Sequence, residues 1–196
     1  RVVDKSQGTA GAICRHFHIP LQSGDNAILK KMNRPYRREA FKKLVLDIKE
    51  IIPDAGIGCD ILIGFPGETD EAFENTRRLI RELPLTYLHV FPFSAREGTP
   101  AGRFPGKVPQ QVVKERCRKI RELGQRKRKA FLNSRIGCAT TVLVENRRNR
   151  GTGQLKGITS NYITVLMEGN DDLMNTFQKV RLTGLHDDQA MVGKLT

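Results

Sequence analysis

The sequence of 196 residues has no long apolar run and no recognisable targeting segment. No uninterrupted apolar stretch approaches the roughly 18 residues that a membrane-spanning helix needs. The opening residues, RVVDKSQGTAGAIC, lack the charged and then apolar pattern of a signal peptide, and they begin with Arg rather than Met. We therefore expect no membrane partner, and we expect a segment of a longer protein whose other part holds further chemistry.

Cysteines are few and widely spaced, at positions 14, 59, 117 and 138. There is no C-x-x-C pair and no His at zinc-finger spacing, which argues against a closed zinc or iron–sulfur site within the chain. Nothing suggests a secreted disulfide framework. The spacing predicts core thiols in a reducing, cytoplasmic environment.

Positive charge is abundant and unevenly distributed. The formal net charge is +13, and residues 110–135 hold ten Lys or Arg against Glu115 and Glu122. A basic helix in this segment is a candidate footprint for a polyanion, whereas the plainer interpretation is a solvated helix face.

Three apolar segments, 17–21, 57–63 and 87–93, read as strands buried on both faces, and helical patterns separate them. Asp25 is the predicted N-cap of a helix over 27–32, and Thr69 caps a helix that Pro84 ends. A helix over 39–52 is expected to bury one apolar face, formed by Phe41, Leu44, Val45, Ile48, Ile51 and Ile52. Strand, loop and helix in this order predict an α/β unit of parallel strands joined by right-handed crossovers.

After residue 136 the pattern changes to short alternating segments separated by Gly, Asn and Asp. Strands are predicted over 140–145, 162–167, 179–182 and 190–195. They predict a small antiparallel β-barrel of the OB or SH3-like kind. The expected domains are therefore 1–133, which includes the basic helix, and 134–196.

Three loops follow the three predicted strands, over 22–26, 64–69 and 94–101, and parallel α/β folds bind ligands at this end of the sheet. Gly64 and Gly67 allow backbone N–H groups to approach a ligand, and Glu68 offers an acceptor. The alternative is a tight turn with a solvated Glu68.

Other residues near this end of the sheet are less specific. Arg34 and Arg96 are candidates to clamp a carboxylate or phosphate, although surface arginines are common. His16 and His18 share a strand face, but the sequence shows no third ligand, so no metal site is predicted.

Three ordered motifs, HIPLQSGDNAILKKMNRPY, DILIGFPGETDEAFENT and LHVFPFSAREGTPAG, precede the basic helix and a terminal barrel with GITSNYITV. In this combination the chain resembles the methylthiotransferases of the radical S-adenosylmethionine superfamily along essentially its whole length. It is most similar to the MtaB type, which methylthiolates threonylcarbamoyl-adenosine next to the anticodon of tRNA. The resemblance implies the second half of a partial (β/α)6 barrel followed by a TRAM domain.

That resemblance also implies a site for S-adenosylmethionine. By match, Gln22 and Ser23 face its ribose, Ile63 and Gly64 pass its adenine, and Phe91 to Ser94 supply a backbone edge. With the candidates from the loops, the expected cofactor-binding residues are Gln22, Ser23, Arg34, Ile63, Gly64, Glu68, Phe91, Ser94 and Arg96.

The family also uses two [4Fe–4S] clusters, whose cysteine motifs do not occur in this sequence. We therefore expect no catalytic residue here, no turnover by the chain alone, and a missing amino-terminal half as its partner. A half barrel exposes strand edges near Phe17 and Tyr87, so self-association is expected.

TRAM-like barrels bind RNA, and tRNA is the expected partner. The expected RNA-binding residues are Arg126, Lys127, Arg128, Lys129, Arg147, Arg148, Arg150, Lys156 and Tyr162, with the three arginines placed in one loop and Tyr162 as a stacking aromatic.

Several alternatives remain. One is the isopentenyl-adenosine tRNA type, and another is a stand-alone RNA-binding module. A third, the ribosomal-protein type, is disfavoured because its corresponding loop reads Gln-His where Gln22 and Ser23 stand here. An unrelated barrel enzyme that holds a phosphate at Gly64 to Glu68 would leave the terminal barrel unexplained.

Overall fold

The computed structural model describes residues 13–96 and 98–196. These residues form two compact units. The first comprises residues 17–124, and the second comprises residues 125–196 together with the described residues 13–16. Both are described separately below.

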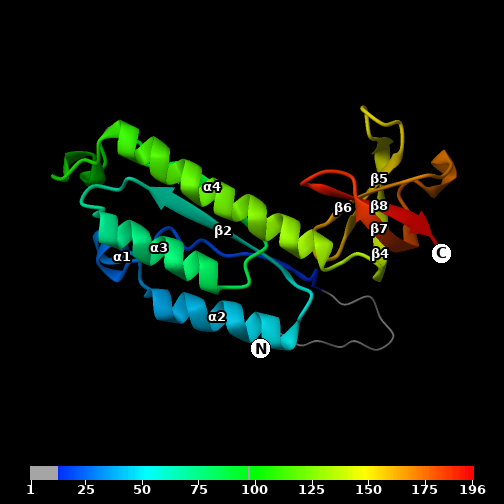
Figure 1. Cartoon of the computed structure of the whole chain (residues 1–196), viewed down its shortest axis with the longest axis horizontal. Helices are drawn as coiled ribbons and strands as arrows, with labels where there is room; N and C mark the ends of the chain where they lie inside the picture. The colour runs from blue at the N-terminus through cyan, green and yellow to red at the C-terminus, as the bar shows by residue number, and fades with distance from the viewer. Residues whose placement is uncertain (1–12, 97) are drawn as a thin grey trace. The chain divides into compact units, whose positions relative to one another are not determined.

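The first unit alternates strands and helices, as Figure 1 shows. Its elements are β1 (His16–His18, whose first residue groups with the second unit), α1 (Asn26–Lys31), α2 (Arg38–Ile51), β2 (Gly56–Ile63), α3 (Asp70–Glu82), β3 (Tyr87–Pro92), the 3-10 helix η1 (Pro100–Arg103) and the first part of α4 (Gln110–Asn133). The expected α/β class is confirmed.

The sheet of this unit has the order β1-β2-β3. β2 and β3 are parallel, in a register that runs from Gly58 opposite Tyr87 to Ile63 opposite Pro92. β1 is shorter than predicted because the ladder is interrupted near Pro20, which has no N–H to donate. Gln22 then rejoins the sheet through an isolated parallel bridge to Ile61.

Both predicted helix caps are confirmed. The Asp25 carboxylate accepts hydrogen bonds from the N–H groups of Ala27 and Ile28, and the Thr69 hydroxyl accepts one from Ala72 N–H. Each side chain satisfies a backbone donor that has no partner within its own helix. The loops after β1 and β2 therefore end at defined positions, which fixes where the following helices begin.

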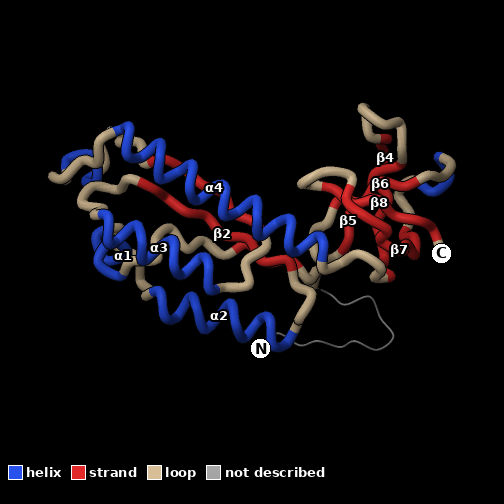
Figure 2. Tube along the Cα trace, viewed as in Figure 1, coloured by secondary structure: helices blue, strands red, loops and turns tan. Residues whose placement is uncertain are grey.

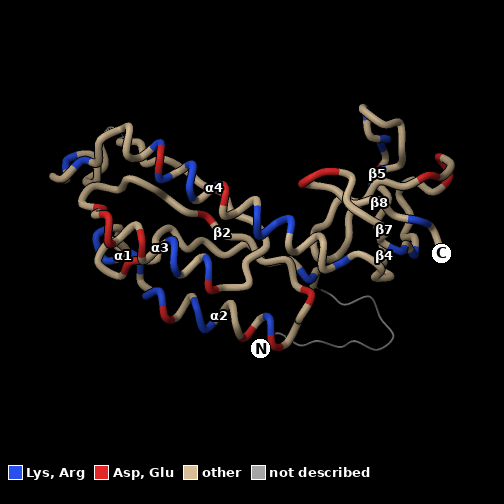
Figure 3. The backbone as a smooth tube through the Cα atoms, viewed as in Figure 1, with Lys and Arg blue, Asp and Glu red and all other residues tan. Residues whose placement is uncertain are grey.

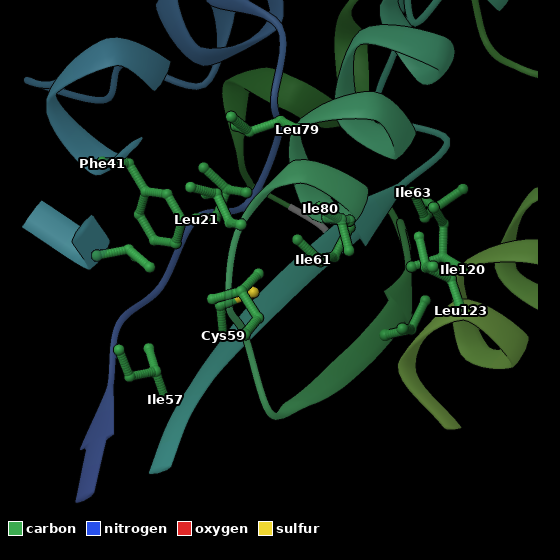
Figure 4. Close-up of a cluster of buried hydrophobic side chains, with 14 of the residues drawn as sticks. Leu21, Phe41, Ile57, Cys59, Ile61, Ile63, Leu79, Ile80, Ile120 and Leu123 are labelled. Atoms are coloured by element: carbon green, nitrogen blue, oxygen red, sulfur yellow. The ribbon is translucent and has the colours of Figure 1, made fainter. Parts of the chain in front are cut away.

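The core of this unit lies between one face of the sheet and helices α2, α3 and α4. Alternate β2 residues, Ile57, Cys59, Ile61 and Ile63, are fully buried there, and Figure 4 shows them among side chains such as Leu79, Ile80 and Ile120. The predicted core face of α2 is wrong at two positions, since Leu44 and Ile51 are 46% and 45% exposed. The apolar face of α2 is wider than the part of it that packs against the core of the first unit.

The second unit contains a closed five-stranded barrel, seen as the red strands of the carboxyl-terminal part in Figure 2. Its elements are β4 (Ala139–Arg148), β5 (Leu155–Thr159), β6 (Thr164–Met167), the 3-10 helix η2 (Asp171–Leu173), β7 (Phe177–Leu185) and β8 (Ala190–Leu195). The strand order around the barrel is β4-β5-β6-β8-β7.

Two details of the predicted barrel are wrong. β5 was not predicted, because its inward positions hold Leu155, Gly157 and Thr159, and small residues hide the apolar alternation. The barrel is also mixed rather than antiparallel, since β6 and β8 pair in parallel. Gly157 is required where it lies, because a Cβ would overlap the Val142 side chain and approach the Leu143 carbonyl to 2.7 Å.

Helices of the described residues are all too short or too polar to cross a membrane.

Candidate functional sites

The loop after β2 is a tight turn built by two glycines with left-handed backbone. Gly64 has φ +81° and Gly67 has φ +83°, and a Cβ at Gly64 would also overlap the Val113 side chain on α4. Ile63, just before the turn, is fully buried. Gly64 N–H donates a hydrogen bond to Glu68 Oε2 at 3.2 Å, so this backbone group already has an internal acceptor.

Glu68 is buried in an ion pair instead of being solvated. Its Oε1 accepts a hydrogen bond from Arg116 Nη1 at 2.6 Å, and the two residues are only 5% and 6% exposed. Arg116 also donates to the Glu68 carbonyl and to Asp70, and its guanidinium lies 5.3 Å from the centre of the Phe73 ring. Burial raises the pKa of the Glu68 carboxyl, and the bonds from Arg116 and Gly64 oppose that rise.

The loop after β1 leaves Gln22 half-buried and buries Ser23. Gln22 has φ +65°, a sparsely populated conformation for a residue other than Gly, and is half-buried. Ser23 is 1% exposed, and its hydroxyl accepts a hydrogen bond from Asp25 N–H and lies 3.4 Å from the Thr76 hydroxyl. Through its contact with Thr76, the Ser23 hydroxyl links this loop to α3.

A hollow of about 250 Å³ lies at the carboxyl ends of β2 and β3. Gly64, Phe93, Lys107 and Val113 are among the residues that line it. Around this end of the sheet the remaining candidates for cofactor binding, Arg34, Phe91, Ser94 and Arg96, are all exposed. Their predicted contacts with a cofactor stay predictions.

The sheet face opposite the helices holds a polar cluster that was not predicted. His18 on β1 lies next to Asp60 on β2, with Nε2 and Oδ1 2.9 Å apart. His89 on β3 is opposite Asp60 in the register and places its Nδ1 3.3 Å from the same oxygen. The three side chains could hold a metal ion, because their ligand atoms all lie within 4.8 Å of one another.

In the second unit, Arg148 and Lys156 are engaged in internal contacts. Arg148 bonds to Asp171 and to the carbonyls of Gly153 and Gly169, so it holds the β4–β5 turn against the segment before η2. Lys156 pairs with Glu145 at 3.0 Å.

Arg147 and Arg148 belong to β4 rather than to a loop, which corrects their predicted position. Arg147 and Arg150 are exposed, and neither forms an ion pair with any described residue.

Tyr162 is a surface aromatic in a strained turn. It is 56% exposed, has φ +67°, and donates its N–H to the Thr159 carbonyl. Its ring stacks on His16, with ring centres 4.3 Å apart and planes inclined by 18°. Because a ring held in this way loses little freedom on binding, it is suited to stacking with a base.

The cations of α4 are not one uniform stripe, although Figure 3 shows Lys and Arg recurring along the helix. Within the first unit, Arg116 is buried, Arg118 pairs with Glu115 and Glu122, and Arg121 donates to the Val90 carbonyl. Within the second unit, Arg128 donates to the Gln189 carbonyl and Lys129 lies 3.9 Å from Asp188. Arg126 and Lys127 precede them, and Arg126 is exposed.

Comparison with known proteins identifies the family of this chain. The model of the radical SAM superfamily matches residues 7–80. A threonylcarbamoyladenosine tRNA methylthiotransferase MtaB of Rickettsia prowazekii is 48% identical over 134 residues, which are 68% of this chain and 32% of the relative. A tRNA-2-methylthio-N(6)-dimethylallyladenosine synthase of Pelotomaculum thermopropionicum is 40% identical over 172 residues, 88% of this chain and 38% of the relative. The chain belongs to the radical SAM methylthiotransferase family.

Membership of the radical SAM methylthiotransferase family explains the architecture as the parallel β/α segment of a radical SAM domain followed by a closed barrel of TRAM type. The chain spans only about 38% of the length of the Pelotomaculum relative and 40% of a similar synthase from Protochlamydia amoebophila. A second MtaB, from Aquifex aeolicus, is 40% identical over 80% of this chain. Relatives named for two different modified adenosines, dimethylallyladenosine and threonylcarbamoyladenosine, therefore match at similar identity.

Two candidate sites of this segment are not evident from the sequence. Arg116 has the sequence context of the other cations of a basic helix, and only its burial separates it from them. Asp60 and His89 interrupt otherwise apolar strands, GIGCDILI and YLHVFP, and that interruption was the available signal. A polar residue inside such a strand points to a site on one face of the sheet.

Proposed function

We propose that the chain is the tRNA-docking and cofactor-orienting part of a tRNA methylthiotransferase. The observation that carries this proposal is the similarity of 40% over 88% of the chain to one tRNA-modifying relative and of 48% over 68% to another. In the whole protein, S-adenosylmethionine and [4Fe–4S] clusters would supply radical and sulfur chemistry. The hollow at the ends of β2 and β3 and the loops around it would orient the adenosylmethionine.

We propose that the ligands of the [4Fe–4S] clusters lie outside this sequence. Its four cysteines are 45, 58 and 21 positions apart, a spacing that cannot wrap one cubane cluster. We therefore propose that the chain alone does not turn over substrate. As a separate molecule it would act as an RNA-binding module, with the barrel making the principal contacts.

RNA binding is tested first by a filter-binding titration against tRNA at about 50 and 200 mM salt, the range in which phosphate contacts weaken steeply. We expect micromolar or tighter binding that falls with salt. The double variant Arg147→Gln, Arg150→Gln should reduce the salt slope by about 2, because each phosphate contact contributes about 1. No binding at either salt would contradict this role for the chain.

A matched control removes two charges elsewhere. Lys42 and Lys43 are exposed on α2, and Lys42→Gln with Lys43→Gln changes the net charge equally. If the two double variants weaken binding to the same extent, the attraction is due to net charge and the barrel is not the docking surface.

Stacking by Tyr162 is tested separately. Tyr162→Ala should weaken tRNA binding by about 1–3 kcal/mol, roughly 5-fold to 150-fold, whereas Tyr162→Phe should retain most of it. Equal losses in both variants would assign the effect to the hydroxyl and not to the ring.

For the substrate we propose threonylcarbamoyl-adenosine, supported by the 48% identity to the Rickettsia relative and by the segment LHVFPFSAREGTPAG. The dimethylallyl-adenosine alternative is supported by the longer match to the Pelotomaculum relative. Mass spectrometry of tRNA nucleosides from a host that lacks both activities and expresses the full-length parent separates them. Methylthio-threonylcarbamoyl-adenosine is the expected product, and the dimethylallyl product would overturn the assignment.

A further inference from the structure

The open face of the three-stranded sheet carries imidazole, carboxylate and phenol groups from three adjacent strands. His18, Asp60 and His89 lie across β1, β2 and β3, and Asp60 and His89 are direct partners in the register. Their side chains are 31%, 24% and 54% exposed. The cluster is therefore fixed by the sheet and accessible in the described structure.

The distances within the cluster are also those of a set of metal ligands. Two imidazole nitrogens face the same oxygen, Asp60 Oδ1, at 2.9 Å from His18 and 3.3 Å from His89. The second separation is longer than an ordinary N–H···O bond. Ligands about 2.0–2.2 Å from one metal ion lie about 3 Å or somewhat more from each other, so the two separations are close to those around a shared ion.

A second residue orients the cluster as metal sites require. The other ring nitrogen of His18, Nδ1, lies 3.1 Å from the Tyr87 hydroxyl. Metal-ligating histidines regularly use their second nitrogen in this way, which fixes the tautomer and the ring orientation. The Tyr87 ring reaches this position because residue 58 is Gly, where a Cβ would overlap the ring.

We propose that His18 Nε2, Asp60 Oδ1 and His89 Nδ1 bind a divalent first-row transition metal ion, of which Zn²⁺ and Fe²⁺ are the natural classes. Two imidazoles and one carboxylate suit these ions, and three protein ligands leave coordination positions for water or a substrate oxygen. The site is separate from the iron–sulfur chemistry proposed above, because it uses no cysteine and lies within this chain.

The proposal is tested by isothermal titration of the untagged chain with Zn²⁺, in a Cys14→Ser background because Cys14 is an exposed thiol. We expect one equivalent bound with micromolar or tighter affinity. Co²⁺ binding gives an independent readout, since its visible absorption reports the ligand geometry.

Three variants locate the site. Tyr87→Phe should weaken binding by roughly tenfold to a hundredfold, the usual effect of losing a second-shell partner, and His89→Ala should weaken it further. His186→Ala is the matched control, because His186 is an exposed histidine of the other unit, and it should bind as the parent does. Because the His89 side chain is half-exposed, we expect His89→Ala to fold, and circular dichroism checks this.

Either of two results would overturn the proposal. One is the absence of saturable binding of Zn²⁺ and Co²⁺ in the micromolar range. The other is saturable binding that His89→Ala and a His18→Ala variant leave unchanged, which would place the ion elsewhere. Neither result bears on the proposed tRNA binding, which depends on the barrel.

Discussion

At the scale of single residues, Arg116 is the clearest case of a side chain whose role depends on its partners. It belongs to the most basic segment of the sequence, yet it is buried and contacts Glu68, Asp70 and the Phe73 ring. Its contacts join the start of α3 to α4 next to the Gly64 turn. A charge that looked available for RNA therefore stabilises the loop that would orient the cofactor.

The Glu68–Arg116 pair gives a stability prediction. Arg116→Met should lower the free energy of unfolding of the first unit by about 3–5 kcal/mol, because it leaves the buried Glu68 carboxylate without its cation. Glu68→Gln should cost less, because Arg116 keeps its ion pair with Asp70. The double variant should be less destabilised than the sum of the two. Urea unfolding followed by far-UV circular dichroism measures this, because most of the helical residues belong to the first unit.

Glu115→Gln is the matched control for this cycle. It removes a carboxylate that pairs with Arg118 at the surface of α4, and surface pairs contribute little. If Glu68→Gln lowers the free energy of unfolding as little as Glu115→Gln does, the buried ion pair does not stabilise the loop after β2.

At the scale of elements, the turn between β7 and β8 depends on one carboxylate. Asp187 accepts hydrogen bonds from the N–H groups of Gln189 and Ala190, both at 2.7 Å, and these bonds lower its pKa. A carboxylate with a lowered pKa stabilises the fold above its ordinary value of 3.8, and this stability is lost as the pH falls through the lower folded value.

We expect Asp187→Ala to destabilise the barrel by about 1 kcal/mol at neutral pH, a modest value because the group is largely exposed to solvent. The difference from the parent should vanish as the pH falls below 3.8. Asp187→Asn keeps an acceptor and should be milder. Hydrogen exchange of barrel amides across this pH range is the measurement, and a difference that persists at low pH would refute the role of the charge.

Prediction from sequence succeeded where local chemistry decides the outcome. The caps at Asp25 and Thr69 follow from side-chain type and spacing. The prediction that the three strands are buried on both faces is wrong, because the sheet face opposite the helices is partly exposed. Prediction failed where distant segments decide, as at Leu44, which the described elements leave 46% exposed, and at the parallel pairing of β6 with β8. The cluster of His18, Asp60 and His89 was missed for the same reason, since it exists only once three strands are in register.

At the scale of the whole molecule, the described sheet has two edges, at β1 and β3. The N–H groups of a parallel strand point alternately to its two sides, so β3 directs some of its N–H groups away from β2. An edge of this kind is a template for another strand.

We expect the chain to self-associate as its concentration rises, and sedimentation velocity should show this. A monomer at all concentrations would contradict the prediction.

The pairing of β8 between β6 and β7 has a consequence for how the barrel forms and fails. Residues 190–195 complete the ring, so a polypeptide that lacks them would leave β6 and β7 each with an open side. We therefore expect barrel assembly to be all-or-none and to wait for this segment, with no stable four-stranded intermediate. Proteolytic loss of these few residues would then abolish the whole barrel at once.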